Sequence, residues 1–252
     1  ASSASELVTP RRPAYARAMR GYGQFCPVAK ASEILAERWT PLIIRELMSG
    51  SERFNDIHRG VPLMSRGLLS QRLRRLIAEG VVEHRAAPGG GAASYHLTEA
   101  GEELAPIIVQ LGQWGARWVR SHLGEEDLDA TLLMWDMRRR VDPARFPPGR
   151  VVVAFEFLDT PRSRRFWWLL SDRDTADLCA TDPGYEVDLR LRGSLQSLTA
   201  VWTGDRTLGA ELGAGHLELR GPPHLRRSFP AWLGLSPFAD VRPARAGGGA
   251  GR

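Results

Sequence analysis

The sequence predicts an α+β protein in two parts, and three observations lead to this fold class. Apolar residues recur at helical spacing through most of the first half of the chain. A short hairpin pattern interrupts that half between about residues 81 and 97. Beyond about residue 150, the apolar period changes from 3.6 to 2, which is typical of strands. The 252 residues are enough for two ordinary domains.

Composition and charge separate the two halves. A hydrophobic content of 43% and a charged content of 25% are typical of a globular protein. Residues 1–124 hold 16 basic and 11 acidic residues, which accounts for the whole net charge of +5, and residues 125–252 are balanced at 18 of each. Excess positive charge favours an anionic partner for the first half. The absence of a long apolar run and the two distant cysteines predict a cytoplasmic protein with no membrane partner.

The stretch from Ser65 to Gly80 is predicted to be a helix with one apolar face and one basic face. Ser65 suits the N-cap, and Gly80 suits the left-handed turn that ends a helix. Such a helix fits a DNA major groove, because phosphates attract arginine while Gln and Arg pair with base edges. The alternative is an ordinary amphipathic helix with a solvated basic face. The candidate DNA-binding residues in and around it are Arg53, Asn55, Ser65, Arg66, Ser70, Gln71, Arg74, Arg75 and Arg85.

A hairpin is predicted directly after this helix. Residues 81–85 and 94–97 alternate as short strands, and the connection between them is rich in glycine and proline. Gly89, Gly90 and Gly91 carry no side chain, so this tip could lie close to a sugar–phosphate backbone. A recognition helix followed by such a hairpin is the layout of a winged helix.

Three helices are predicted before the recognition helix, and each begins at a local signal. The first starts at Pro27 with Cys26 as its cap and runs to about Arg38. The second opens with Thr40 and Pro41 and ends near Gly50, and a short third helix covers residues 53–57. These helices supply the apolar support for the recognition helix.

A further helix is predicted after the hairpin, with Thr98 as its cap and a kink at Pro106. It carries an apolar stripe that a small winged helix has no core to cover. We therefore expect a homodimer, with two recognition helices about 34 Å apart on a pseudo-palindrome. The alternative is packing against the second half of the chain. The predicted dimerisation residues are Leu104, Ile107, Ile108, Leu111, Trp114 and Trp118.

A series of motifs follows in a fixed order and spacing over residues 21–118, namely Cys26-Pro27, Arg38-Trp39-Thr40, Arg53-Phe54-Asn55-Asp56-Ile57, Ser65, Leu69-Ser70-Gln71-Arg72-Leu73, Gly80-Val81-Val82 and Tyr95-His96-Leu97-Thr98. With these motifs, the first half resembles the HxlR-type winged-helix regulators of bacteria. The resemblance implies a dimeric regulator of transcription that binds double-stranded DNA. Residues 36–38 depart from the family pattern, which has two glycines and a lysine there, and we expect this departure to leave the DNA-facing residues undisturbed.

The second half is predicted to contain strands between two helices. The first helix covers residues 132–139, and the closing helix covers residues 225–235 with Pro230 inside it. The predicted strands are 151–158, 166–170, 177–181, 186–192, 200–202 and 216–219.

This half resembles the sterol-carrier-protein-like fold over residues 128–239. The resemblance rests on the pattern of residues 187–193, 195–204 and 215–221 and on the helix that follows. It implies a five-stranded α/β domain with an apolar ligand tunnel between the sheet and the helices. The alternative is that the aromatic residues are simply core. The candidate pocket residues are Met134, Trp135, Phe155, Phe157, Trp168, Trp202, Phe229 and Trp232.

No motif predicts catalysis, a metal site or a cofactor, and the six histidines are scattered. Cys26 is the one residue with reactive potential, because a helix N-terminus favours a thiolate. The HxlR resemblance also implies that a cysteine at this place senses oxidants or electrophiles in some members. A small buried apolar residue is the alternative role for Cys26.

The sequence therefore predicts four segments. They are a flexible basic arm over residues 1–20, a winged-helix and dimerisation domain over 21–123, a sterol-carrier-like domain over 124–241 and a disordered tail over 242–252. The leading prediction is a dimeric transcriptional regulator modulated by an apolar small molecule. One alternative makes Cys26 the sensor, and a second makes the protein a lipid carrier or an enzyme with a dimer module that does not bind DNA.

Overall fold

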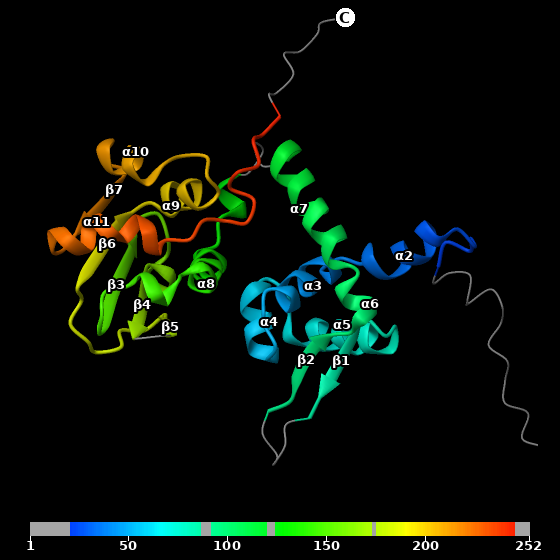
Figure 1. Ribbon diagram of the computed structural model, residues 1–252. Helices are drawn as coiled ribbons and strands as arrows, with labels where there is room; N and C mark the ends of the chain where they lie inside the picture. Colours follow the sequence, from blue (N-terminus) through cyan, green and yellow to red (C-terminus); the bar gives the residue numbers. More distant parts are fainter. Residues whose placement is uncertain (1–20, 87–91, 120–123, 173–174, 245–252) are drawn as a thin grey trace, which may run out of the picture.

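Two hydrophobic cores organise the chain, one in each half. The computed structural model describes residues 21–86, 92–119, 124–172 and 175–244 (Figure 1). The predicted arm over 1–20, the glycine tip at 89–91 and most of the predicted tail lie outside the described residues. The boundary between the predicted domains at residues 123 and 124 also falls at the edge of an undescribed stretch.

The N-terminal core is built from helices that begin where the local signals predict. Ser65 caps α5 by accepting a hydrogen bond from the amide of Leu68, and Gly80 has a φ of +72° just beyond the helix. Trp39, which precedes α3, has a φ of +80° and is the only non-glycine residue with positive φ among the described residues. The helices are α2 (Pro27–Leu35), α3 (Thr40–Met48), α4 (Phe54–Gly60) and α5 (Arg66–Ala78).

The predicted hairpin is present as β1 (Val82–Arg85) paired antiparallel with β2 (Ser94–Leu97). The prediction of one kinked helix after it is wrong in detail, because the structure has two helices, α6 (Glu99–Glu102) and α7 (Ala105–Trp118). Pro106 lies in the first turn of α7, where its missing amide proton has no intrahelical partner to lose. Helix α6 therefore ends before the proline, and α7 begins as a separate helix.

The C-terminal half contains a five-stranded sheet in the order β5-β4-β3-β6-β7. β3 and β6 are parallel, and the other neighbours are antiparallel. The predicted strand at 200–202 is wrong, because these residues form the last turn of α9, a helix capped by the Ser194 hydroxyl. The strands are β3 (Arg150–Phe157), β4 (Phe166–Asp172), β5 (Thr175–Cys179), β6 (Leu189–Gly193) and β7 (Leu217–Arg220).

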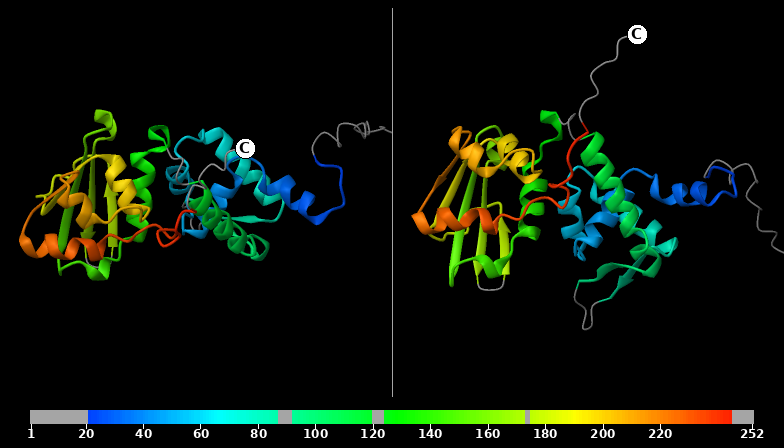
Figure 2. Two further views of the ribbon diagram at one scale, coloured as in Figure 1. Left: turned by 90° about the horizontal axis from the view of Figure 1, so that it is seen from above. Right: turned by 45° about the horizontal axis from the view of Figure 1, so that its top comes forward.

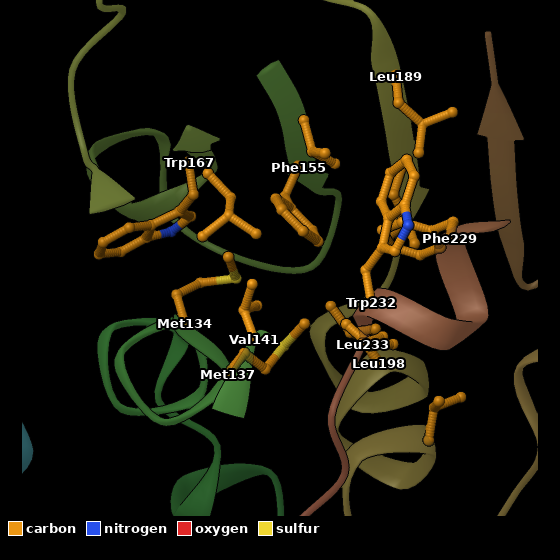
Figure 3. Close-up of a cluster of buried hydrophobic side chains, with 14 of the residues drawn as sticks. Met134, Met137, Val141, Phe155, Trp167, Leu189, Leu198, Phe229, Trp232 and Leu233 are labelled. Atoms are coloured by element: carbon orange, nitrogen blue, oxygen red, sulfur yellow. The ribbon is translucent and has the colours of Figure 1, made fainter. Parts of the chain in front are cut away.

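Helices from three parts of the sequence share one core with the sheet (Figure 3). Alternate residues of β3 face this core, among them Phe155 and Phe157, and meet Met134 from α8 and Trp232 from α11. The helices are α8 (Ala130–Arg140), α9 (Leu195–Trp202), α10 (Leu208–Gly213) and α11 (Pro223–Trp232), with short 3-10 turns η3 (Glu125–Asp127), η4 (Pro143–Arg145) and η5 (Arg162–Arg164).

The segment after α11 returns to the N-terminal half and lies against α7 (Figures 1 and 2). The Phe238 ring lies so close to Gly112 that a Cβ on that glycine would be 2.2 Å from Cζ of the ring. The amide of Ala244 donates a hydrogen bond to the carbonyl of Arg117 at 2.7 Å. Ala244, which the sequence places in a disordered tail over residues 242–252, is thus held on α7.

A buried carboxylate joins the two halves at the contact of α8 with α3 and α4. Glu46 of α3 has no exposed side-chain surface, and its Oε2 accepts from Arg139 Nη1 of α8 at 2.7 Å. Arg45 Nη2 donates to Glu46 Oε1 at 2.7 Å and to the carbonyl of Gly60 at 2.8 Å. Asp136 also pairs with Arg139, while burial raises the pKa of the Asp136 carboxyl. A buried charge is stable only with such partners.

Trp135 lies beside this cluster, at the contact between the halves, whereas the sequence predicts it to line a ligand pocket. The guanidinium of Arg59, from α4, lies 5.1 Å from the Trp135 ring centroid. Arg138 and Arg139, from α8 itself, lie at 5.4 Å and 5.8 Å from the same centroid. Cations over an indole face attract its ring electrons, and this attraction strengthens when water is excluded. Trp135 therefore helps to join the two halves.

We expect Gly60→Ala to lower the free energy of unfolding by about 1–3 kcal/mol, the usual penalty of overpacking. A Cβ at Gly60 would be 1.9 Å from the Glu46 carboxylate, so the buried ion cluster would have to move. Gly209→Ala, in α10 with nothing within 4 Å of its Cβ, is the control and should not destabilise the protein. Urea unfolding measures the stability of both variants. Equal midpoints would contradict the close contact of Gly60 with the Glu46 carboxylate.

Candidate nucleic-acid interface

The polar face of α5 is exposed while its leucines are buried. Leu69, Leu73 and Leu76 lie in the N-terminal core. Gln71 and Arg74 lie on the opposite side and are exposed. Arg74 Nη1 donates to the half-buried Ser70 Oγ at 2.8 Å, which orients the guanidinium along the helix. This arrangement presents a flat polar strip to solvent.

The helix before α5 adds exposed polar groups at the N-terminal end of this strip. Arg66 Nη2 donates to Asn55 Oδ1 at 2.5 Å, and the Arg66 guanidinium lies 5.3 Å from the Phe54 ring centroid. Arg53 and Ser65 are exposed there as well. The structure thus brings residues from α4 and α5 to one surface, and their role in DNA binding stays a prediction.

Arg75 is placed differently from the expectation. Its Nη1 pairs with Glu37, and its Nη2 donates to the carbonyl of Glu33 at 2.9 Å. Arg72 pairs with the other oxygen of Glu37. Both guanidinium groups therefore bind the chain near α2 and are not free for an anionic partner. Glu37 belongs to the stretch where the sequence departs from the HxlR pattern, so the expectation that this departure leaves the DNA-facing residues undisturbed is corrected.

Arg85 lies at the end of β1 and is exposed, as expected for a wing residue. It forms an ion pair with Glu83 on the same strand, which lowers the positive charge that the wing offers. His84 lies opposite Tyr95, with ring centroids 4.9 Å apart, and His96 lies opposite Glu83. Within the described residues, no group of three or more His, Cys, Asp or Glu is placed to hold a metal ion.

The apolar stripe of α7 is divided between a core and an exposed face. Ile108 is buried in the N-terminal core, and Leu104 is partly buried against it. The other four predicted dimerisation residues are between 51% and 58% exposed and follow one side of α7, namely Ile107, Leu111, Trp114 and Trp118. Exposed aromatic and aliphatic surface of this extent is unusual on a monomer.

Cys26 precedes α2 as its N-cap and is partly buried. Its side chain makes no capping hydrogen bond, and its carbonyl accepts from the amide of Lys30 at 3.0 Å. Cys179 is also a free thiol, at the end of β5. The sensing role of Cys26 stays a prediction.

Most of the predicted pocket residues are packed in the core and do not line an open pocket. Trp168 is half-buried on the other face of β4, and the remaining seven are buried. Six of those seven share the C-terminal core, in which Phe229 packs edge-on against Trp232 at 6.0 Å between ring centroids. Trp202 also lines a cavity between the two halves. The aromatic residues thus act mainly as core, which was the alternative interpretation.

The described helices are all too short or too polar to cross a bilayer. The HxlR-like helix-turn-helix family matches residues 34–123 of the chain. The HTH-type transcriptional regulator YvaP of Bacillus subtilis is 39% identical over 98 residues, which are 38% of this chain and 91% of that protein. YybR, another HTH-type transcriptional regulator of Bacillus subtilis, is 32% identical over 36% of this chain and 73% of its own length.

Among solved structures, the oxidised form of the redox regulator HypR is 31% identical and has a TM-score of 0.34. It matches 36% of this chain and 94% of its own length. The reduced form of the transcriptional regulator YodB from Bacillus subtilis is 32% identical, with a TM-score of 0.33, over 36% of this chain and 92% of its own.

We expect Arg75→Gln to lower the free energy of unfolding by up to about 1 kcal/mol, because it removes a partly exposed ion pair and a hydrogen bond to Glu33. Arg74→Gln, one residue earlier, is the matched control and should change stability by less than about 0.5 kcal/mol. Urea unfolding compares the two. If Arg74→Gln lowers the free energy of unfolding more than Arg75→Gln does, Arg75 is not the arginine that stabilises the fold.

Proposed function

We propose, on the premise that the chain belongs to the HxlR-like helix-turn-helix family, that it is a transcriptional regulator whose helix α5 enters the major groove of duplex DNA. The observation that carries the proposal is the exposed pair Gln71 and Arg74 on the face opposite the buried leucines. Gln pairs with adenine edges and Arg with guanine edges in the major groove. Arg53, Asn55, Ser65, Arg66 and Ser70 would contact phosphates or base edges beside them.

The β1–β2 wing would follow the backbone next to this groove, with Arg85 as its cation. Arg75 has no part in this surface, since Glu37 and Glu33 hold it. Most of the affinity is then expected from a few arginines, so binding should weaken as salt rises.

The regulator would act as a homodimer through α7. The exposed face of Ile107, Leu111, Trp114 and Trp118 supports this, because burying it against a second copy removes a large apolar area from water. Phe25 and Val28 at the start of α2 are also exposed and could extend the same interface. A two-fold axis there would place two copies of α5 on one side of the dimer.

The C-terminal half would supply part of the site for a small effector with an apolar body, at the cavity that Trp202 lines, since most of the other residues predicted to line a tunnel are packed as core. Its sheet has the five strands that the sterol-carrier-like resemblance implies, and α8, α9 and α11 share a core with it. An effector changes DNA affinity only if it binds the DNA-competent and incompetent states differently. The contacts of α8 and of the segment after α11 with the winged helix supply a route for such a difference.

We expect the double variant Gln71→Ala/Arg74→Ala to lose at least tenfold in affinity for a duplex selected from a random library, because each base contact contributes about 1–3 kcal/mol. Arg162→Ala, an exposed arginine of the C-terminal half, is the control and should bind like the unaltered protein. Fluorescence anisotropy at fixed salt measures both. Failure of the unaltered protein to select any sequence would refute the proposal.

We expect Trp114→Glu to convert the dimer into a monomer, because a charge cannot be buried in an apolar interface without a partner. Leu158→Glu is the control, since Leu158 is a comparably exposed apolar residue after β3 and should leave the mass unchanged. Light scattering after size exclusion reports the mass. A monomeric unaltered protein, or a dimeric Trp114→Glu variant, would count against an α7 interface.

A further inference from the structure

A cavity of about 480 Å³ lies between the winged helix and the C-terminal half, away from the core where the sequence predicts a tunnel. Its walls come from α3, α7, α8, the end of α9 and residues 236–238. Sites for small molecules in proteins usually measure about 300–1,000 Å³ and often lie at domain interfaces. The volume and the place therefore suit a small ligand.

One part of the cavity wall is apolar and aromatic. Its residues come from α3 and α7 in the N-terminal half and from the end of α9 and residues 236–238 in the C-terminal half. They are Met48, Ile108, Val109, Trp202, Pro237 and Phe238. Such a wall binds a ring or a short hydrocarbon body by removing it from water.

The polar part of the wall carries one uncompensated positive charge. Arg45 and Arg139 are paired with the carboxylates of Glu46 and Asp136. Arg140 uses only its Nε, which donates to the carbonyl of Leu235 at 3.1 Å. Its two Nη groups have no hydrogen-bond partner within the described part of the chain.

We infer that this cavity binds an organic monoanion with an apolar, ring-bearing body, and that the free Nη groups of Arg140 pair with its anionic group. A planar guanidinium with two adjacent N–H donors matches a carboxylate in a bidentate pair. The apolar body then lies between Trp202 and the α7 residues. Arg140 is exposed, so water solvates its Nη groups beside a neutral molecule, and only an anionic group replaces that water with a bidentate pair. The site therefore discriminates by charge as well as by shape.

Occupancy of the site would also bias the position of α7, a step that rests on the proposed function. The ligand would contact Ile108 and Val109 of α7 and at the same time Trp202 and Phe238 of the C-terminal half. Filling the cavity therefore changes how firmly these elements are held together. Since α7 would carry the dimer interface, the separation of the two α5 helices would change with it.

The test is calorimetric titration of the full chain with 1-naphthoate and with its neutral counterpart 1-naphthamide. We expect 1-naphthoate to bind at least tenfold more tightly than the amide, because a charge-assisted hydrogen bond is the stronger kind. Arg140→Gln should remove this preference and leave the weak binding of the amide unchanged. Arg162→Gln is the matched control and should bind both compounds like the unaltered protein.

A second variant keeps the test independent of Arg140. Val109→Trp would fill the cavity from its α7 wall and should abolish binding of both compounds. Absence of 1-naphthoate binding at millimolar concentration, equal affinity for the anion and the amide, or full binding by Arg140→Gln would each overturn the inference.

The regulatory step is tested separately with the selected duplex. If 1-naphthoate binds and changes DNA affinity, both the site and the coupling stand. If it binds and DNA affinity does not change, the coupling fails while the site stands. If the unaltered protein binds 1-naphthoate but no DNA, the proposed function fails and the ligand site is unaffected.

Discussion

The position of the two halves depends on a single buried carboxylate. Glu46 has no contact with water, so its charge is stable only with the guanidinium groups of Arg45 and Arg139 on either side. Arg139 belongs to α8, and this requirement therefore fixes α8 against α3 and α4. Gly60 is required at the same point, because any side chain there would overlap the carboxylate. Arg45, Asp136 and Arg139 of this ion cluster also line the cavity between the halves.

The winged helix could be predicted well from sequence because its signals are local. Ser65 and Gly80 mark the ends of α5 within a few residues, and the observed cap and positive φ confirm both. The hairpin follows from short alternating segments around a glycine-rich tip. The helix starts at Pro27 and Pro41 are equally local, since proline in a first turn sacrifices no hydrogen bond.

What could not be predicted depends on distant partners. Arg74 and Arg75 are neighbours with the same chemistry, and only the fold shows that Glu37 takes one of them. Ile108 belongs to the same helical stripe as Leu111, yet the packing of α3 against α7 buries the first and leaves the second exposed. The cavity is lined by residues nearly 200 positions apart in sequence, such as Arg45 and Phe238, so no local pattern could indicate it.

The Glu46–Gly60–Arg139 contact has a consequence for the exchange of domains between relatives. A stretch of 98 residues, 38% of this chain, matches 91% of the length of YvaP. In a hybrid that joins another winged helix to the present C-terminal half, Arg139 would need a carboxylate at position 46, and that carboxylate would need a glycine at position 60. Compatibility between the modules thus depends on a few buried residues at their contact.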